Sequence, residues 1–157
     1  MRHYIWHSEY LYNILQPDEM AMTFSILDFK GLTFGETRGP NMGLVKKAVS
    51  ICGNHYPERN FCTAIINTPM WFNGLYKVVA LVLDPVTRKK IHVFGSGKKE
   101  EAKATKFLHE MIDPCNLPPQ FGGTSCPFGE SPQDIEMNQN MENVLKARGV
   151  ESFKVDE

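Results

Sequence analysis

Four polar side chains in this sequence, two hydroxyls, one carboxylate and one ammonium, have groups that could contact a ligand. Thr23 and Ser25 lie two residues apart, so on a β-strand their hydroxyls face the same side. Lys90 provides a point charge suited to a phosphate group, and Glu58 can accept hydrogen bonds or orient the lysine. From the residues alone, hydroxyls tolerated in a strand and a surface ion pair, or two solvated charges, explain these side chains at least as well.

Covalent catalysis and metal binding have little support in the sequence. The chain contains no G-x-S-x-G elbow, no Walker loop and no H-E-x-x-H motif. A nucleophile at Cys62 or Cys115 would need His55 or His92 beside it in space, and Cys62 lies in an expected core strand. The cysteines include no C-x-x-C pair and show no ligand spacing with the histidines. We therefore expect reduced thiols, no metal, no cofactor and no enzymatic activity.

Composition is that of a single globular domain. The 157 residues are 42% hydrophobic and 22% charged. With a formal net charge of −1, no global positive field favours nucleic acid or an anionic membrane, so any membrane contact has to be local. The longest apolar run, residues 78–83, is too short to span a bilayer, and the start lacks the apolar segment of a secretory signal. These features predict a cytoplasmic protein that does not bind nucleic acid.

The hydrophobic pattern predicts three strands separated by helices. We expect strands at residues 20–29, 61–67 and 91–94 and helices at 2–15, 41–52, 70–83 and 98–112. A tail helix is expected to follow Ser131, which caps it, with Pro132 in its first turn. Asp84 and Asp113, each followed by proline, are expected to cap short helical turns. This alternation predicts an α/β fold with a small parallel βαβαβ sheet covered by helices.

The helix expected at residues 70–83 is unusually apolar. Large apolar side chains recur in it at helical spacing: Trp71, Phe72, Leu75, Val78, Val79 and Val82. Its remaining faces are apolar as well, so the helix is either buried on all sides or closes over something apolar. From periodicity alone, a well-packed core helix is the favoured interpretation.

Four motifs occur in a fixed order around and after this helix. They are Y-P-E-R at residues 56–59, I-I-N-T-P at 65–69, D-P-V-T-R-K-K-I at 84–91 and N-L-P-P-Q-F-G-G at 116–123. Together they resemble the Sec14-like, or CRAL-TRIO, lipid-binding domain. The resemblance implies a CRAL-TRIO-like fold and the non-enzymatic binding and transfer of a phospholipid, either phosphatidylinositol or phosphatidylcholine.

The resemblance also implies roles for individual residues. Glu58, Thr87 and Lys90 match a headgroup site for phosphatidylinositol, and Thr23 and Ser25 match hydroxyls that contact the headgroup of phosphatidylcholine. The apolar helix matches a gate that swings to admit lipid, and the large side chains named above would then line the acyl pocket.

The expected boundaries and partners combine this resemblance with a change in residue pattern after Cys126, where a linker and a capped helix begin. Residues 1–126 correspond to the lipid-binding domain without the N-terminal helical bundle and first strands of the family, and residues 127–157 to a linker and a helix that packs on the body. An uncovered sheet edge would favour a homodimer. The expected partners are thus a phospholipid and, transiently, a membrane surface. The alternative is a Sec14-like scaffold for protein interactions that lacks a functional lipid pocket.

Overall fold

The computed structural model describes residues 2–37, 58–149 and, between these ranges, residues 43, 47, 50, 51 and 54–56. Most of the helix expected at residues 41–52 lies outside the described residues. The chain divides into two compact units, Met1–Leu108 and His109–Glu157, here called unit 1 and unit 2.

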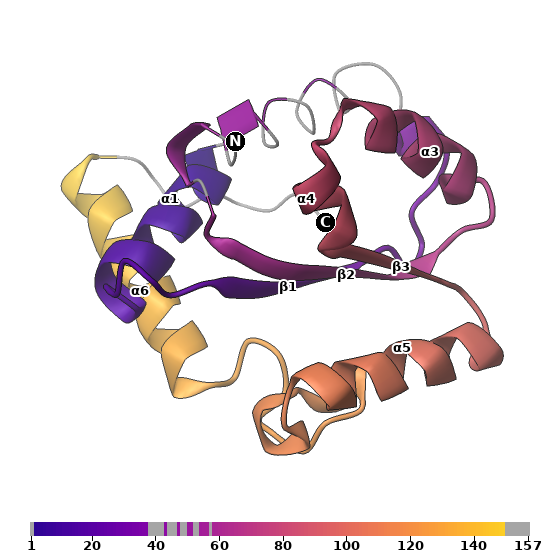
Figure 1. The fold of residues 1–157 in the computed structure, drawn as a ribbon. Helices are drawn as coiled ribbons and strands as arrows, with labels where there is room; N and C mark the ends of the chain where they lie inside the picture. The colour runs from indigo at the N-terminus through magenta and orange to yellow at the C-terminus, as the bar shows by residue number, and fades with distance from the viewer. Residues whose placement is uncertain are drawn as a thin grey trace. The chain divides into compact units, whose positions relative to one another are not determined.

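Unit 1 is built on a three-stranded parallel sheet. The strands β1 (Thr23–Asp28), β2 (Asn60–Thr68) and β3 (Ile91–Gly95) lie in this order (Figure 1). β1 begins later than predicted because the residues before it form a turn, in which the Met20 N–H donates to the Asp18 carboxylate. The predicted α/β fold with a small parallel sheet is confirmed.

One face of the sheet packs against α5 (Lys98–Met111). The ring centroid of Phe107 on this helix lies 6.4 Å from that of Phe24 and 5.3 Å from that of Phe94. The parallel register pairs Phe24 with the buried Cys62, so these two side chains point to the same face. Part of the core of unit 1 lies on this face, where Ala64 of β2 and Leu108 of α5 are also buried.

Two helices lie over the opposite face, as Figure 1 shows: α3 (Phe72–Val82) and α4 (Pro85–Lys89). α3 is the predicted apolar helix. It begins at Phe72 because the Pro69 carbonyl accepts the Phe72 N–H in a preceding turn. The Phe72 side chain is buried and meets the ring of Phe29 edge-on, with centroids 5.1 Å apart. The first turn of α3 is therefore anchored by aromatic packing.

The N-terminal helix ends in a wider turn than predicted. Residues expected to form one α-helix form α1 (Arg2–Tyr10) followed by the π-helical turn η1 (Leu11–Leu15). Gln16 closes this turn by donating its N–H to the Leu11 carbonyl at 2.9 Å. Such turns are rare and are frequent at functional sites. A short 3₁₀ helix, η2 (Gly35–Thr37), follows β1.

In unit 2, the last residues of α5 are followed by two 3₁₀ turns, η3 (Pro114–Asn116) and η4 (Pro119–Phe121). As predicted, Asp113 caps the first by accepting the Cys115 N–H at 2.9 Å. A Cβ atom on Gly123 would lie 1.8 Å from the Leu117 carbonyl oxygen, so only glycine fits there.

The second half of unit 2 contains α6 (Pro132–Ala147). The Ser131 hydroxyl accepts the Asp134 N–H at 3.1 Å and donates to the Asp134 carboxylate at 2.8 Å, which confirms the predicted cap. The boundary predicted at residue 126, and the packing of the tail helix on the body, stay predictions. The same holds for a homodimer through a sheet edge, although β1 and β3 each have one neighbouring strand among the described residues.

Candidate functional site

Glu58 and Lys90 lie together at the amino end of the sheet. The Lys90 Nζ atom is 3.5 Å from the Glu58 carboxylate and donates to the Asn60 carbonyl at 2.8 Å. Lys90 is partly buried, with 26% of its side chain exposed, whereas Glu58 is 86% exposed. The two candidate headgroup residues are thus brought into contact, and the open side of the pair faces solvent.

Lys90 is held in this position because it directly follows α4. Asp84 caps the helix by accepting the N–H groups of Val86 and Thr87 at 2.9 and 2.8 Å, and Pro85 follows it as predicted. Hydrogen bonding from Thr87 holds the pKa of the Asp84 carboxyl below its usual value. The Lys90 carbonyl then accepts the Thr63 N–H at 2.8 Å, which ties the end of α4 to β2. Thr87, the third candidate headgroup residue, therefore takes part in the helix cap.

Glu58 has a backbone conformation that few residues adopt. Its φ angle is +62°, in the left-handed region that favours glycine. A non-glycine residue held there costs free energy and persists only where surrounding contacts fix it. Such residues cluster at binding and catalytic sites, so this angle marks the segment around Glu58 as a place to look for function.

Arg59 makes the contacts that surround this segment. Its Nη1 atom hydrogen-bonds to the carbonyl oxygens of Asp18 and Glu19, both at 2.6 Å, and of Ala21 at 3.1 Å. Its guanidinium carbon lies 4.4 Å from the centroid of the Tyr12 ring, which is a cation–π geometry. Sequence reasoning did not single out Arg59, although it belongs to the Y-P-E-R motif.

Thr23 is joined to the same network. Its hydroxyl donates to the Arg59 carbonyl at 3.1 Å and lies 3.2 Å from the Tyr12 hydroxyl, while its N–H donates to the Arg59 carbonyl at 2.8 Å. Ser25, the other hydroxyl of the predicted pair, is half-buried and is paired with Thr63 in the sheet register. We call Tyr12, Thr23, Glu58, Arg59 and Lys90 the polar corner.

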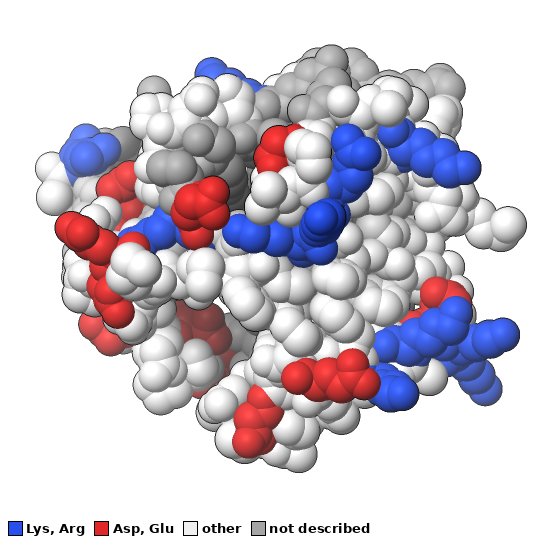
Figure 2. Space-filling view, in the orientation of Figure 1, with Lys and Arg blue, Asp and Glu red and all other residues white. Residues whose placement is uncertain are grey.

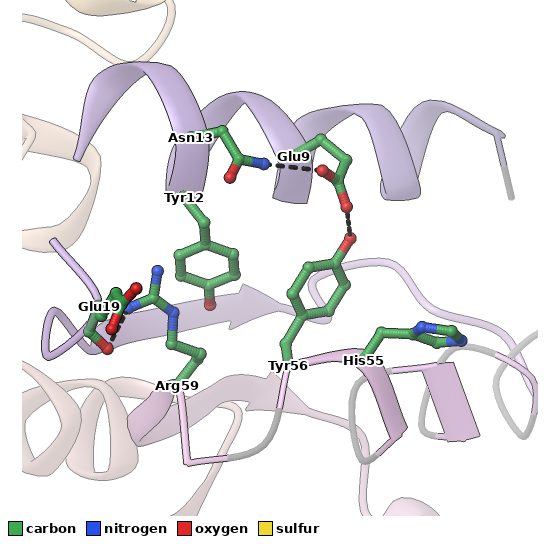
Figure 3. Close-up of a pocket in the computed structure, with 7 residues that line it drawn as sticks. All are labelled: Glu9, Tyr12, Asn13, Glu19, His55, Tyr56 and Arg59. Atoms are coloured by element: carbon green, nitrogen blue, oxygen red, sulfur yellow. Dashed lines mark hydrogen bonds between the residues drawn. The ribbon is translucent and has the colours of Figure 1, made fainter. Parts of the chain in front are cut away.

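A polar cavity of about 380 Å³ adjoins the polar corner. Figure 3 shows Tyr12 and Tyr56 side by side in it, with Arg59 beneath Tyr12. The tyrosine ring centroids are 5.4 Å apart. The Tyr56 hydroxyl donates to the Glu9 carboxylate, whose other oxygen accepts from the Asn13 amide at 2.7 Å. The sequence did not predict this cavity, because its lining comes from four separate places: α1, η1, the turn before β1 and the segment before β2.

The candidate gate residues differ in how far their side chains are buried. Phe72 is buried, and Trp71, Leu75 and Val79 are half-buried. Val78 is 64% exposed, and the side chain of Val82 lies outside what the structure describes. The polar cavity described above and a second cavity, in unit 2, are both lined by residues outside α3.

The structure also shows the surroundings of the candidate cysteine nucleophiles. Burial in β2 raises the pKa of the Cys62 thiol, which makes it a poor nucleophile. Cys115 is exposed in unit 2, and hydrogen bonding to Asp113 raises the pKa of its thiol. Within the described residues, no group of three or more potential metal ligands comes together. Among the helices that the structure describes, none is both long and apolar enough to cross a bilayer.

Basic side chains gather at two places on unit 1. Figure 2 shows Lys and Arg side chains over α4 and, separately, at the start of α5. The first group contains Arg88 and Lys89, and the second contains Lys98 and Lys99. Positive charge is therefore local, as the near-zero net charge requires.

Comparison with known proteins decides the family. The sequence profile of the CRAL/TRIO domain matches residues 1–123. The chain belongs to the CRAL/TRIO domain family. This confirms the resemblance inferred from the four motifs. The crystal structure of Sfh5 has the same fold, with a TM-score of 0.56 at 18% identity over 76% of this chain and 42% of that chain.

Curated CRAL/TRIO relatives are similar over about two thirds of the chain. The SEC14 cytosolic factor of Yarrowia lipolytica is 40% identical over 101 residues, which are 64% of this chain and 19% of that protein. The phosphatidylinositol/phosphatidylcholine transfer protein SFH9 of Arabidopsis thaliana is 35% identical over 99 residues, which are 63% of this chain and 16% of that protein. The chain thus spans less than a fifth of the length of these two relatives.

Proposed function

We propose that this chain binds a phospholipid, phosphatidylinositol or phosphatidylcholine, and transfers it between membranes without chemical change. Two of the relatives, SFH9 and SFH4 of Arabidopsis thaliana, are named as transfer proteins for these lipids. The observation that carries the proposal is the contact between Glu58 and Lys90, which brings a cation suited to a phosphate group together with a carboxylate that can accept hydrogen bonds from hydroxyls.

The headgroup of phosphatidylinositol would bind at this pair. Its phosphate would accept hydrogen bonds from Lys90, and its inositol hydroxyls would donate to Glu58. Because Glu58 is largely exposed and Lys90 is held by the Asn60 carbonyl, the carboxylate can turn toward a ligand while the ammonium keeps its place. Thr87 lies on α4 one turn before Lys90 and would contact the same phosphate.

The headgroup of phosphatidylcholine would bind at the hydroxyls of Thr23 and Ser25. The Thr23 hydroxyl already lies within hydrogen-bonding distance of Tyr12 and of the Arg59 carbonyl, so a phosphate there would compete with these partners. Ser25, on the same side of β1, is the better candidate for a direct contact.

The acyl chains would lie against the sheet face opposite α5, behind α3. Exposing an acyl chain of roughly sixteen carbons to water costs about 13 kcal/mol of free energy, at about 0.8 kcal/mol per methylene. A lipid carrier therefore has to cover the acyl chain. Leu27 and Phe61 point to this face, because they alternate with residues of the α5 face, and both are more than 40% exposed. Apolar surface is therefore available on this face of the sheet, over which α3 and α4 lie in Figure 1, and α3 would act as the gate.

Delivery requires transient contact with a membrane, and the chain would act in the cytoplasm. Arg88 and Lys89 on α4, with the exposed Val86 between them and the cap, provide positive charge beside an apolar side chain. Each basic residue near an anionic membrane surface contributes about 1 kcal/mol, which suits reversible binding.

Native mass spectrometry of the full chain, purified from cells, tests the proposal. We expect a bound phospholipid. Lys90→Ala should then lower binding to vesicles that contain phosphatidylinositol by about tenfold, as expected for the loss of a charge-assisted hydrogen bond. Binding to phosphatidylcholine alone should be unchanged.

Lys89→Ala is the matched control, because it removes the same charge from the neighbouring exposed residue. If Lys90→Ala and Lys89→Ala lost the same affinity for phosphatidylinositol vesicles, binding would depend only on the total positive charge of the surface. That result would refute the headgroup site. A chain that arrives empty and takes up no lipid from either kind of vesicle would favour the protein-interaction scaffold instead.

A further inference from the structure

The segment Glu58-Arg59-Asn60 holds Lys90 from two sides. The Glu58 carboxylate lies 3.5 Å from the Lys90 Nζ atom, and the Asn60 carbonyl accepts from the same atom at 2.8 Å. Both groups belong to neighbours of Arg59. The geometry around the lysine is therefore set by the backbone path through these three residues.

This path is not one that the sequence favours by itself. Glu58 has a positive φ angle although it is not glycine, so contacts elsewhere have to fix it. Arg59 supplies such contacts at both of its ends. Its guanidinium group is held by three carbonyl groups of residues 18–21 and by the Tyr12 ring, and its own carbonyl accepts two hydrogen bonds from Thr23.

We propose that Arg59 is a positioning residue for the inositol headgroup site. It touches no lipid, but it fixes the segment on which Glu58 and Asn60 meet Lys90 and so sets the affinity for a phosphoinositide headgroup. The inference rests on the proposed function, since it needs Lys90 to bind the headgroup. Arginine suits this role because its planar guanidinium can stack on tyrosine while it donates to several acceptors.

The same residue joins the two predicted headgroup sites. The Thr23 hydroxyl, a candidate contact for phosphatidylcholine, is bonded to the Arg59 backbone rather than to its side chain. Replacing the side chain therefore leaves that bond in place. Loss of the guanidinium group should weaken binding of phosphatidylinositol more than binding of phosphatidylcholine.

A double-mutant cycle on the full chain tests this role. Arg59→Met keeps the length of the side chain and removes its hydrogen bonds. The carbonyl groups that it leaves belong to exposed or half-exposed residues, so water can replace it and we expect a folded protein. Affinity for phosphatidylcholine vesicles containing phosphatidylinositol should fall about tenfold, but in the Lys90→Ala background Arg59→Met should have almost no further effect.

Arg148→Met is the matched control. It removes the same charge from an exposed residue that follows α6 in unit 2, and this residue belongs neither to the polar corner nor to the basic group on α4. We expect little change in the binding of either lipid. Arg59→Lys restores the charge and some of the hydrogen bonds but not the stacking, and it should recover part of the lost affinity.

The outcomes separate this inference from the function on which it rests. If Lys90→Ala leaves phosphatidylinositol binding unchanged, the headgroup site itself is wrong. Two results would overturn the inference and show that Arg59 is only structural. In the first, Lys90→Ala lowers the affinity for phosphatidylinositol, and Arg59→Met lowers it further by its full separate effect. In the second, Arg59→Met lowers the affinity for both lipids equally and also lowers the unfolding temperature. Should Arg59→Met fail to fold, the same cycle with Arg59→Lys gives the decision.

Discussion

The polar corner and α3 are held in place by different kinds of contact. In the polar corner, Arg59 and Lys90 each make several directed hydrogen bonds or charge contacts to residues distant in the sequence. α3 is held by apolar packing on one side, where Phe72 is buried and Leu75 and Val79 are half-buried. On its other side, Val78 and Leu81 are 64% and 79% exposed.

This difference indicates which part can move. Directed bonds fix a geometry, because each loses most of its strength with small changes in angle. Apolar contacts are not directional, so a helix held mainly by apolar side chains can shift at a lower cost. Under the proposed function, in which α3 is the gate, we therefore expect the polar corner to keep its shape when α3 moves.

Removing the anchor of α3 should have the largest effect on stability. Phe72→Ala deletes a buried ring that contacts Phe29, Trp71 and Tyr76. We expect the free energy of unfolding to fall by about 3 kcal/mol, measured by urea denaturation. Val78→Ala on the same helix is the control, and it should change stability by less than about 0.5 kcal/mol because its side chain is exposed.

Equal losses in these two variants would show that α3 is packed along its whole length. The contrast between a fixed corner and a movable helix would then disappear.

A smaller effect on stability is expected at Asp84, which caps α4, the helix that precedes Lys90. The pKa of Asp84 is lower in the folded protein than its usual 3.8, chiefly because of hydrogen bonding from Thr87. The stability from its carboxylate is therefore fully present above pH 3.8 and is lost as the pH falls through the lower, folded-state pKa. Asn caps helices about as well as Asp but does not titrate, so Asp84→Asn lacks this contribution at every pH.

The contribution of the Asp84 carboxylate can be measured from the unfolding temperatures of the wild type and of Asp84→Asn between pH 7 and pH 2. We expect the wild type to unfold at a slightly higher temperature at neutral pH and the two curves to converge in acid. Because the carboxylate is exposed, solvent screening keeps the difference small. A constant difference across the range would mean that the charge of Asp84 does not contribute to the cap.

Local features of the structure could be predicted from the sequence. The caps at Asp84, Asp113 and Ser131 occur where they were expected, because each depends on a side chain and the backbone of the next three residues. The three strands also occur where the apolar runs predicted them, and only their ends differ.

The polar corner could be predicted only in part. The pairing of Glu58 with Lys90 came from the family resemblance, since two charges far apart in sequence give no periodic signal. Arg59 was missed because its partners lie at residues 12 and 18–23, and no local rule connects them. The positive φ angle of Glu58 is likewise imposed by tertiary contacts against the local preference of the residue.

The smallest effect on stability is expected at Glu58 itself. Its carboxylate is 3.5 Å from Lys90 and largely exposed, so the ion pair should contribute less than about 1 kcal/mol to stability. Glu58→Gln keeps the size and a hydrogen-bond acceptor, and we expect an unfolding temperature close to that of the wild type. Binding of phosphatidylinositol should nevertheless weaken, because a neutral amide accepts hydrogen bonds from inositol hydroxyls less strongly than a carboxylate does. If stability falls while lipid binding is unchanged, the contact serves the fold, and the corner would then be a structural clamp rather than the place where a headgroup binds.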